Sequence, residues 1–205
     1  MAVDHLFSIP LGKYKLPNFA EVKEKFVPSL IEEYRETDEK NRHADNWKCN
    51  SYQTWMWGNG QEELSDSLFP FIDEYLNGMG FSPFSYQLES WFNVYGKQQF
   101  QESHAHNTSL LAGMVVLNYD KEQHTPIVFR NPWMEYARTF QQFDCSAMSP
   151  VCADSTSVTL EEGHMYLWLS SLSHLVPPQP NTLKDLRITF TFNVNPDNKW
   201  DSINK

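Results

Sequence analysis

Two histidines, His104 and His106, form the only close histidine pair in the chain and lie between two strand-like segments. Residues two apart on a strand point to the same side, so both imidazoles and the carboxylate of Glu102 would share one face. Imidazole and carboxylate groups are common metal ligands, and His174 is the natural partner of the pair. Because a single histidine is more often a hydrogen-bonded surface or core residue, the pair alone leaves a metal site and a polar strand face both open.

The segment around His174 adds further residues that could do chemistry. A strand-like stretch, Tyr166–Leu169, precedes this histidine, and a proline-rich bend at Pro177–Pro180 follows it. The next segment alternates between apolar and polar residues, which predicts a strand with Arg187 and Thr189 on one face. Together with the histidine pair, these features form one pattern, of which they are the second half.

This combination resembles the 2-oxoglutarate/Fe(II)-dependent oxygenases, and within them a small family found in bacteria and their viruses. Members of that family read W-x-N, a glycine, H-x-H, a strand of small residues, F-x-x-P, G-x-x-x-L-F-P-S, H-x-V-x-P and R-x-x-x-x-F-N. The corresponding segments of this chain are Trp91–Asn93, Gly96, His104–His106, Leu111–Gly113, Phe129–Pro132, Gly163 with Trp168–Ser170, His174–Pro177 and Arg187–Asn193. The match runs from Trp91 to Asn193, about half of the chain, and its order and spacing make it specific.

The resemblance implies a mainly β (α+β) fold, a double-stranded β-helix of the jelly-roll or cupin-like kind, with N-terminal helices packed on the outside. It implies Fe(II) and the co-substrate 2-oxoglutarate as cofactors, with His104, His106 and His174 as the catalytic metal ligands. Arg187 would grip the far carboxylate of 2-oxoglutarate, with Thr189 beside it, because arginine is a permanently charged, forked donor. The implied reaction uses dioxygen and couples decarboxylation of 2-oxoglutarate to succinate with oxidation, by expectation hydroxylation, of a second substrate.

Two residues depart from the superfamily pattern. His106 stands where a carboxylate is usual, so three arrangements stay open: three imidazoles hold the iron, Glu102 replaces the carboxylate, or His106 is not a ligand. Val116 stands where related enzymes often have a tyrosine that helps to hold 2-oxoglutarate. We expect Asn93, Tyr95 or Thr191 to take over that contact.

Two other function classes fit the same residues. In a three-histidine, cupin-like dioxygenase or hydrolase, the arginine would bind a substrate carboxylate and 2-oxoglutarate would not be used. In a non-catalytic β-sandwich, such as a viral structural or binding module, the histidines would merely share a polar strand face. The oxidised substrate stays open among a free amino acid, a nucleotide and a residue of a protein, and so does the oligomeric state.

Composition narrows the classes further. The 205 residues fit a single domain, and the formal charge of −10 without a basic block argues against binding to a nucleic-acid backbone. Cys49, Cys145 and Cys152 have no C-x-x-C spacing, which favours a reducing, cytoplasmic setting. The N-terminus lacks the pattern of a signal peptide, and the longest apolar run is too short to cross a membrane.

Hydrophobic periodicity divides the chain into two regions. Residues 1–84 are expected to form helices and short strands, with strands in 4–15 and 47–57 and helices over 19–39 and 61–78; a kink or break is expected at Pro28. Residues 85–195 are expected to form the double-stranded β-helix core, with strands over 86–95, near 104, and over 110–118, 127–129, 158–160, 165–169 and 187–194. Core packing is the expected use of most members of the tryptophan set Trp47, Trp55, Trp57, Trp91 and Trp133.

Overall fold

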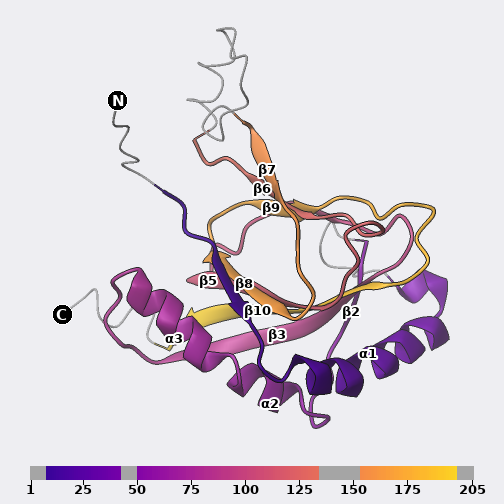
Figure 1. Ribbon diagram of the computed structural model, residues 1–205, viewed down its shortest axis with the longest axis horizontal. Helices are drawn as coiled ribbons and strands as arrows, with labels where there is room; N and C mark the ends of the chain where they lie inside the picture. Colours follow the sequence, from indigo (N-terminus) through magenta and orange to yellow (C-terminus); the bar gives the residue numbers. More distant parts are fainter. Residues whose placement is uncertain (1–7, 43–49, 134–152, 198–205) are drawn as a thin grey trace, which may run out of the picture.

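Two antiparallel β-sheets form the body of the computed structural model, which describes residues 8–42, 50–133 and 153–197 (Figure 1). The larger sheet has the strand order β1 (Gly12–Lys15), β8 (His164–Leu169), β5 (Leu111–Asn118), β10 (Arg187–Pro196), β3 (Tyr86–Tyr95) and β2 (Tyr52–Thr54). The smaller sheet has the order β4 (Gln101–His104), β9 (His174–Val176), β6 (Ile127–Arg130) and β7 (Ser155–Val158). This arrangement is the double-stranded β-helix, or jelly roll, that the sequence predicts.

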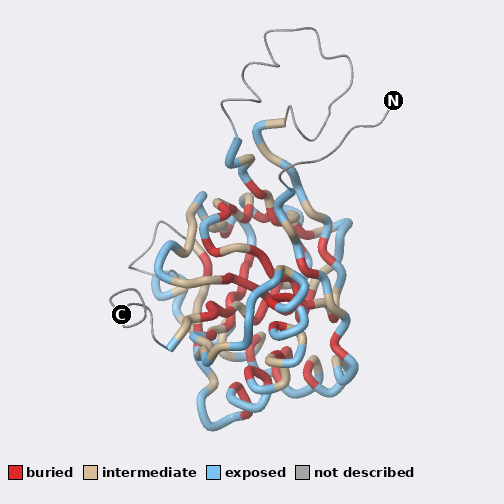
Figure 2. Tube along the Cα trace, turned by 90° about the vertical axis from the view of Figure 1, so that its left-hand side faces the viewer, coloured by how far each residue is buried: buried red, intermediate tan, exposed pale blue. Residues whose placement is uncertain are grey.

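The larger sheet is covered on both faces, which explains the uninterrupted apolar sequence of β5. Every residue of β5 is buried, because alternate side chains enter two different cores. Leu111, Val115 and Leu117 pack toward the helices, whereas Met114 and Val116 pack against the smaller sheet. Buried residues therefore run along the central strands, and the connecting loops are largely exposed (Figure 2).

Three helices cover the outer face of the larger sheet (Figure 1): α1 (Phe19–Glu36), α2 (Gln61–Asp66) and α3 (Phe69–Gly78). A short 3₁₀ turn, η1 (Glu39–Asn41), follows α1. The apolar face of α1 supplies Val22, Phe26 and Leu30 to the core beneath it. No helix of the described residues is long and apolar enough to span a membrane.

Two predictions about the helices are wrong in detail. The break that the sequence allowed at Pro28 does not occur, because α1 continues through this residue. Pro28 lies on the exposed side, where water can hydrate the carbonyl that lacks a partner. The single helix predicted over 61–78 is two helices. Pro70 cannot donate a hydrogen bond to the carbonyl of Asp66, so α2 ends there and α3 begins anew with its proline in the first turn.

Other differences concern strands and tryptophans. β7 ends at Val158, the first residue of the predicted strand 158–160, and β9 escapes prediction because three residues carry too little periodicity. The prediction of core packing is wrong for three tryptophans. Trp55 and Trp57 are each 53% exposed, and Trp133 is 51% exposed. Trp47 and all three cysteines lie outside the described residues.

Candidate metal and anion site

Three histidines converge where the two sheets meet. His104 ends β4 and His174 begins β9, and the two residues are direct partners in the antiparallel pairing of these strands. His106 lies two residues beyond the end of β4, and one ligand nitrogen from each histidine lies within 4.8 Å of the other two. The ring centroids are 4.4 Å apart for His104 and His174, 4.9 Å for His104 and His106, and 5.3 Å for His106 and His174. This group has the size and the ligand type of a first coordination shell for one divalent metal.

Hydrogen bonds set the orientation of two of these rings. Nδ1 of His104 lies 2.7 Å from the carbonyl oxygen of Glu102, and Nδ1 of His174 lies 2.9 Å from that of Leu172. A carbonyl can only accept, so each Nδ1 carries the proton and each Nε2 keeps its lone pair for a metal. His106 is held through its backbone, whose N–H donates to the carbonyl of Ser170 at 2.8 Å.

The surroundings keep the three imidazoles neutral. Burial lowers the pKa of His174 to about 3 and that of His106 to about 4, with neighbouring histidines acting in the same direction. Burial also lowers the pKa of His104. Neutral imidazole is the form that binds a metal, so the site is in its ligand form at neutral pH.

The expectation that residues 102, 104 and 106 share one strand face is wrong, because β4 ends at His104. Glu102 is exposed and lies outside the cluster, and it meets His104 through its main-chain carbonyl. Three histidines, without a carboxylate, thus make up the cluster among the described residues.

Aromatic side chains surround the histidines. The ring of His174 lies 5.0 Å from that of Trp168 and 6.0 Å from that of Phe129, and the ring of His106 lies 6.5 Å from that of Trp91. Such walls limit the access of water and lower the local dielectric constant.

Arg187 lies on the inner face of the larger sheet, the face that is turned toward the smaller sheet, and is 1% exposed. Its guanidinium carbon lies 4.8 Å from the ring centroid of Tyr95, its partner on β3. Burial lowers the pKa of Arg187, and Tyr95 and Tyr119 act in the opposite direction; an arginine still stays protonated in a protein. Nε and Nη2 have no hydrogen-bond partner among the described residues. A buried cation with unused donors calls for an anion, and a carboxylate matches the planar fork.

The polar residues expected around the arginine line the same face. Thr189 is 2% exposed and stands opposite Asn93, while Thr191 is the next inward residue of β10. Nδ2 of Asn93 donates to Oγ1 of Thr191 at 2.8 Å, and the hydroxyl oxygens of the two threonines are 3.5 Å apart. Val116 stands opposite Thr189 on β5 and belongs to the apolar core between the sheets.

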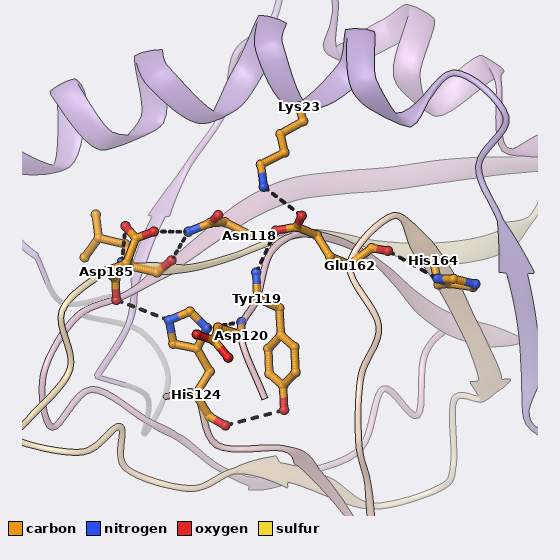
Figure 3. Close-up of polar contacts among 9 residues, drawn as sticks. Lys23, Asn118, Tyr119, Asp120, His124, Glu162, His164 and Asp185 are labelled. Atoms are coloured by element: carbon orange, nitrogen blue, oxygen red, sulfur yellow. Dashed lines mark hydrogen bonds and ion pairs between the residues drawn. The ribbon is translucent and has the colours of Figure 1, made fainter. Parts of the chain in front are cut away.

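A hydrogen-bond network that no sequence pattern predicts fixes the chain just before Arg187, at the start of β10 (Figure 3). Nδ2 of Asn118 donates to Oδ2 of Asp185 at 2.9 Å and to the carbonyl of Leu186 at 2.7 Å. His124 accepts from the backbone N–H of Asp120 at Nδ1, so its Nε2 carries the proton and donates to the carbonyl of Asp185 at 3.2 Å. Both residues immediately before Arg187 are thereby fixed.

Residues 89–193 match a family model whose description reads "Putative 2OG-Fe(II) oxygenase". The matched segment is half of the chain and holds all three histidines and the arginine. No curated protein sequence shows a significant match.

Solved structures share the fold at low sequence identity. A prolyl-4-hydroxylase from Pseudomonas putida is 11% identical with a TM-score of 0.62, over 92% of this chain and 94% of that one. A prolyl hydroxylase from Trichoplax adhaerens, in complex with a hypoxia inducible factor peptide, is 11% identical with a TM-score of 0.59, over 91% and 83%. HygX from Streptomyces hygroscopicus, with nickel, 2-oxoglutarate and hygromycin B bound, is 12% identical with a TM-score of 0.59, over 92% and 84%.

Proposed function

We propose that this chain, which belongs to the 2-oxoglutarate- and Fe(II)-dependent oxygenases, binds iron through His104, His106 and His174 and 2-oxoglutarate through Arg187. When bound, the iron would supply the activation of dioxygen, which would be consumed as 2-oxoglutarate is converted to succinate and carbon dioxide and a second substrate is oxidised, in our proposal by hydroxylation. The observation that carries the assignment of residues is the buried guanidinium with two unused nitrogens, on the sheet face that also meets the histidine cluster.

The spacing along β3 and β10 supports one elongated site. Arg187 and Tyr95 form one row across the two strands, and Thr191 and Trp91 form a row four residues away, about 13 Å at the rise of a strand. Since the ring of Trp91 lies 6.5 Å from that of His106, the anion-binding end and the metal-binding end share this face. The proposed co-substrate lies along this face between the two rows, with its far carboxylate on the arginine and its other end toward the histidines.

The other residues of the face bind and orient the co-substrate. Thr189 lies between the two rows and offers a hydroxyl, while the amide of Asn93 fixes the hydroxyl of Thr191. Tyr95 packs on the guanidinium and limits its rotation. The aromatic rings beside the histidines exclude water, which strengthens the attraction between the arginine and a carboxylate.

The two other classes considered from the sequence do not agree with the family match. A metal enzyme that does not use 2-oxoglutarate would have to supply a substrate carboxylate to the buried arginine, and the matched family does not have that reaction. A non-catalytic sandwich explains neither the cluster of imidazoles nor the buried guanidinium. At 11–12% identity, the neighbours named above share the fold alone, so their substrates are not carried over.

Anaerobic addition of Fe(II) and 2-oxoglutarate tests the proposal. We expect a visible charge-transfer band and, after admission of air, succinate formed in proportion to the 2-oxoglutarate consumed. His174→Ala should lose the band because the cluster loses one of its three ligands. A folded, iron-loaded protein that shows no band and releases no succinate would contradict the proposed function.

A further inference from the structure

The inner face of the larger sheet continues beyond the metal cluster, on the side away from Arg187. The next row across four strands is formed by Glu89, Asn193, Ala112 and Trp168, each a direct partner of the next. Trp168 lies 5.0 Å, between ring centroids, from His174, so this row reaches the cluster. We call it the distal row. The co-substrate proposed above extends toward Arg187, which leaves the distal row for the second substrate.

Two hydrogen-bond acceptors stand side by side in the distal row. Nδ2 of Asn193 donates to Oε2 of Glu89 at 3.1 Å, and this contact fixes the orientation of the amide, since a carboxylate can only accept. The amide oxygen Oδ1 of Asn193 has no partner among the described residues, although Asn193 is only 7% exposed. A buried acceptor without a partner is uncommon and indicates a missing donor.

Glu89 is exposed at the end of the distal row, so water hydrates its carboxylate when no ligand is bound. Within residues 8–42, 50–133 and 153–197, no lysine, arginine or histidine forms an ion pair with this carboxylate. Trp91 is the next inward residue of β3 and offers an aromatic face, which attracts cations. Ala112, the smallest side chain of the row, stands between Asn193 and Trp168 and is buried in the core between the sheets.

We propose that the distal row binds the second substrate and recognises a cationic nitrogen group, an ammonium or a guanidinium. The inference rests on the proposed function, because it assumes that 2-oxoglutarate fills the opposite side of the cluster. A cation with several N–H groups satisfies the carboxylate of Glu89 and Oδ1 of Asn193 together. A neutral apolar group would leave the amide oxygen unpaired, and an anion would be repelled by the carboxylate.

Calorimetric titration tests the inference. The protein is loaded with Zn(II), which has no redox chemistry, and with 2-oxoglutarate, whose own binding is measured first. L-Lysine and L-arginine are then titrated against L-norleucine and L-citrulline, which keep the α-ammonium and differ in having an uncharged side chain. Gly-Lys-Gly and Gly-Arg-Gly, with blocked termini, form a second arm that separates a free amino acid from a residue within a peptide.

In at least one of the two arms, we expect the ligand with a cationic side chain to bind at least about tenfold more tightly than the ligand with an uncharged one. This difference in affinity corresponds to the free energy of one charge-assisted hydrogen bond. Glu89→Gln should abolish this preference, and Asn193→Ala should weaken cation binding. Glu24→Gln, on the exposed side of α1, removes the same charge elsewhere and should change nothing.

Different failures have different meanings. If 2-oxoglutarate binds but neither arm shows a preference for cations, or the preference survives in Glu89→Gln, the assignment of the distal row is wrong and the proposed function stands. If 2-oxoglutarate does not bind to the zinc-loaded protein, the proposed function is wrong and this inference falls with it. Circular dichroism of each variant separates a lost contact from a lost fold.

Discussion

Replacing Arg187 by methionine separates a ligand-binding role of this residue from a structural one. The side chain is 1% exposed, and two of its three guanidinium nitrogens, Nε and Nη2, have no partner among the described residues. Replacing buried charges by apolar groups of similar volume is often neutral or stabilising by about 1–4 kcal/mol. We therefore expect the free energy of unfolding of Arg187→Met, measured without ligand, to be no lower than that of the wild type.

Binding of 2-oxoglutarate should respond in the opposite way. A hydrogen bond to a charged group contributes about 1.5–3 kcal/mol, so two bonds from the unused nitrogens to one carboxylate contribute about 3–6 kcal/mol. This corresponds to a loss of about two to four powers of ten in affinity. Arg187→Lys should lie between the two proteins, because it keeps a charge but loses the planar fork.

The assay is calorimetry of 2-oxoglutarate with the zinc-loaded proteins, together with urea unfolding of the same proteins without ligand. Arg35→Met, which removes an exposed arginine of α1, is the matched control and should keep both properties. If Arg187→Met binds 2-oxoglutarate within threefold of the wild type, the arginine is not the carboxylate anchor. A free energy of unfolding lowered by more than about 2 kcal/mol would show a structural role instead, as expected for breaking a buried network.

Three further predictions concern the cluster and the core. His106→Asp should retain Fe(II), because a carboxylate is also a suitable iron ligand, whereas His106→Ala should lower the iron affinity by at least about tenfold; metal analysis after dialysis decides. The metal-free protein should lose stability as the pH falls below about 6.5. The pKa values of His106 and His174 are about 4 and about 3 in the folded state, so below about pH 6.5 the unfolded chain binds more protons than the folded one. Urea unfolding between pH 8 and pH 4 measures this loss, and a constant free energy of unfolding would contradict the prediction. Gly113→Ala should cost about 1–3 kcal/mol of unfolding free energy, since a Cβ would lie 2.5 Å from Cζ of Phe192, while Gly78→Ala, with no atom within 4 Å of its Cβ, should be harmless in the same measurement.

The sequence predicts much of the fold because its signals are local. The alternation of β3 and β10 and the apolar face of α1 are each contained in one segment, so periodicity finds them. The break before α3 is also a local signal, since Pro70 stands in the sequence, but the continuous helical spacing hides it. β9 has three residues, and its existence depends on pairing with β4 and β6.

The site is harder to predict, because its residues meet only through pairing between distant strands. His104 and His174 are neighbours through the register of β4 and β9, and a motif resemblance was the only means of joining them from the sequence. Arg187 followed from the same resemblance. Asn118 and Asp185, which fix the start of β10, and the contact between Glu89 and Asn193 have no sequence signature, since each is a side-chain contact set by register.

The three histidines are not held in the same manner. His104 and His174 belong to paired strands and have fixed rings, so exchanging either one disturbs the smaller sheet. His106 lies beyond β4 and is attached through its main chain to Ser170, a bond that any residue except proline can make. The one histidine of the cluster that departs from the superfamily pattern is thus the one whose identity the scaffold does not dictate. We expect a substitution at this position to change the set of proposed metal ligands while the framework stays unchanged.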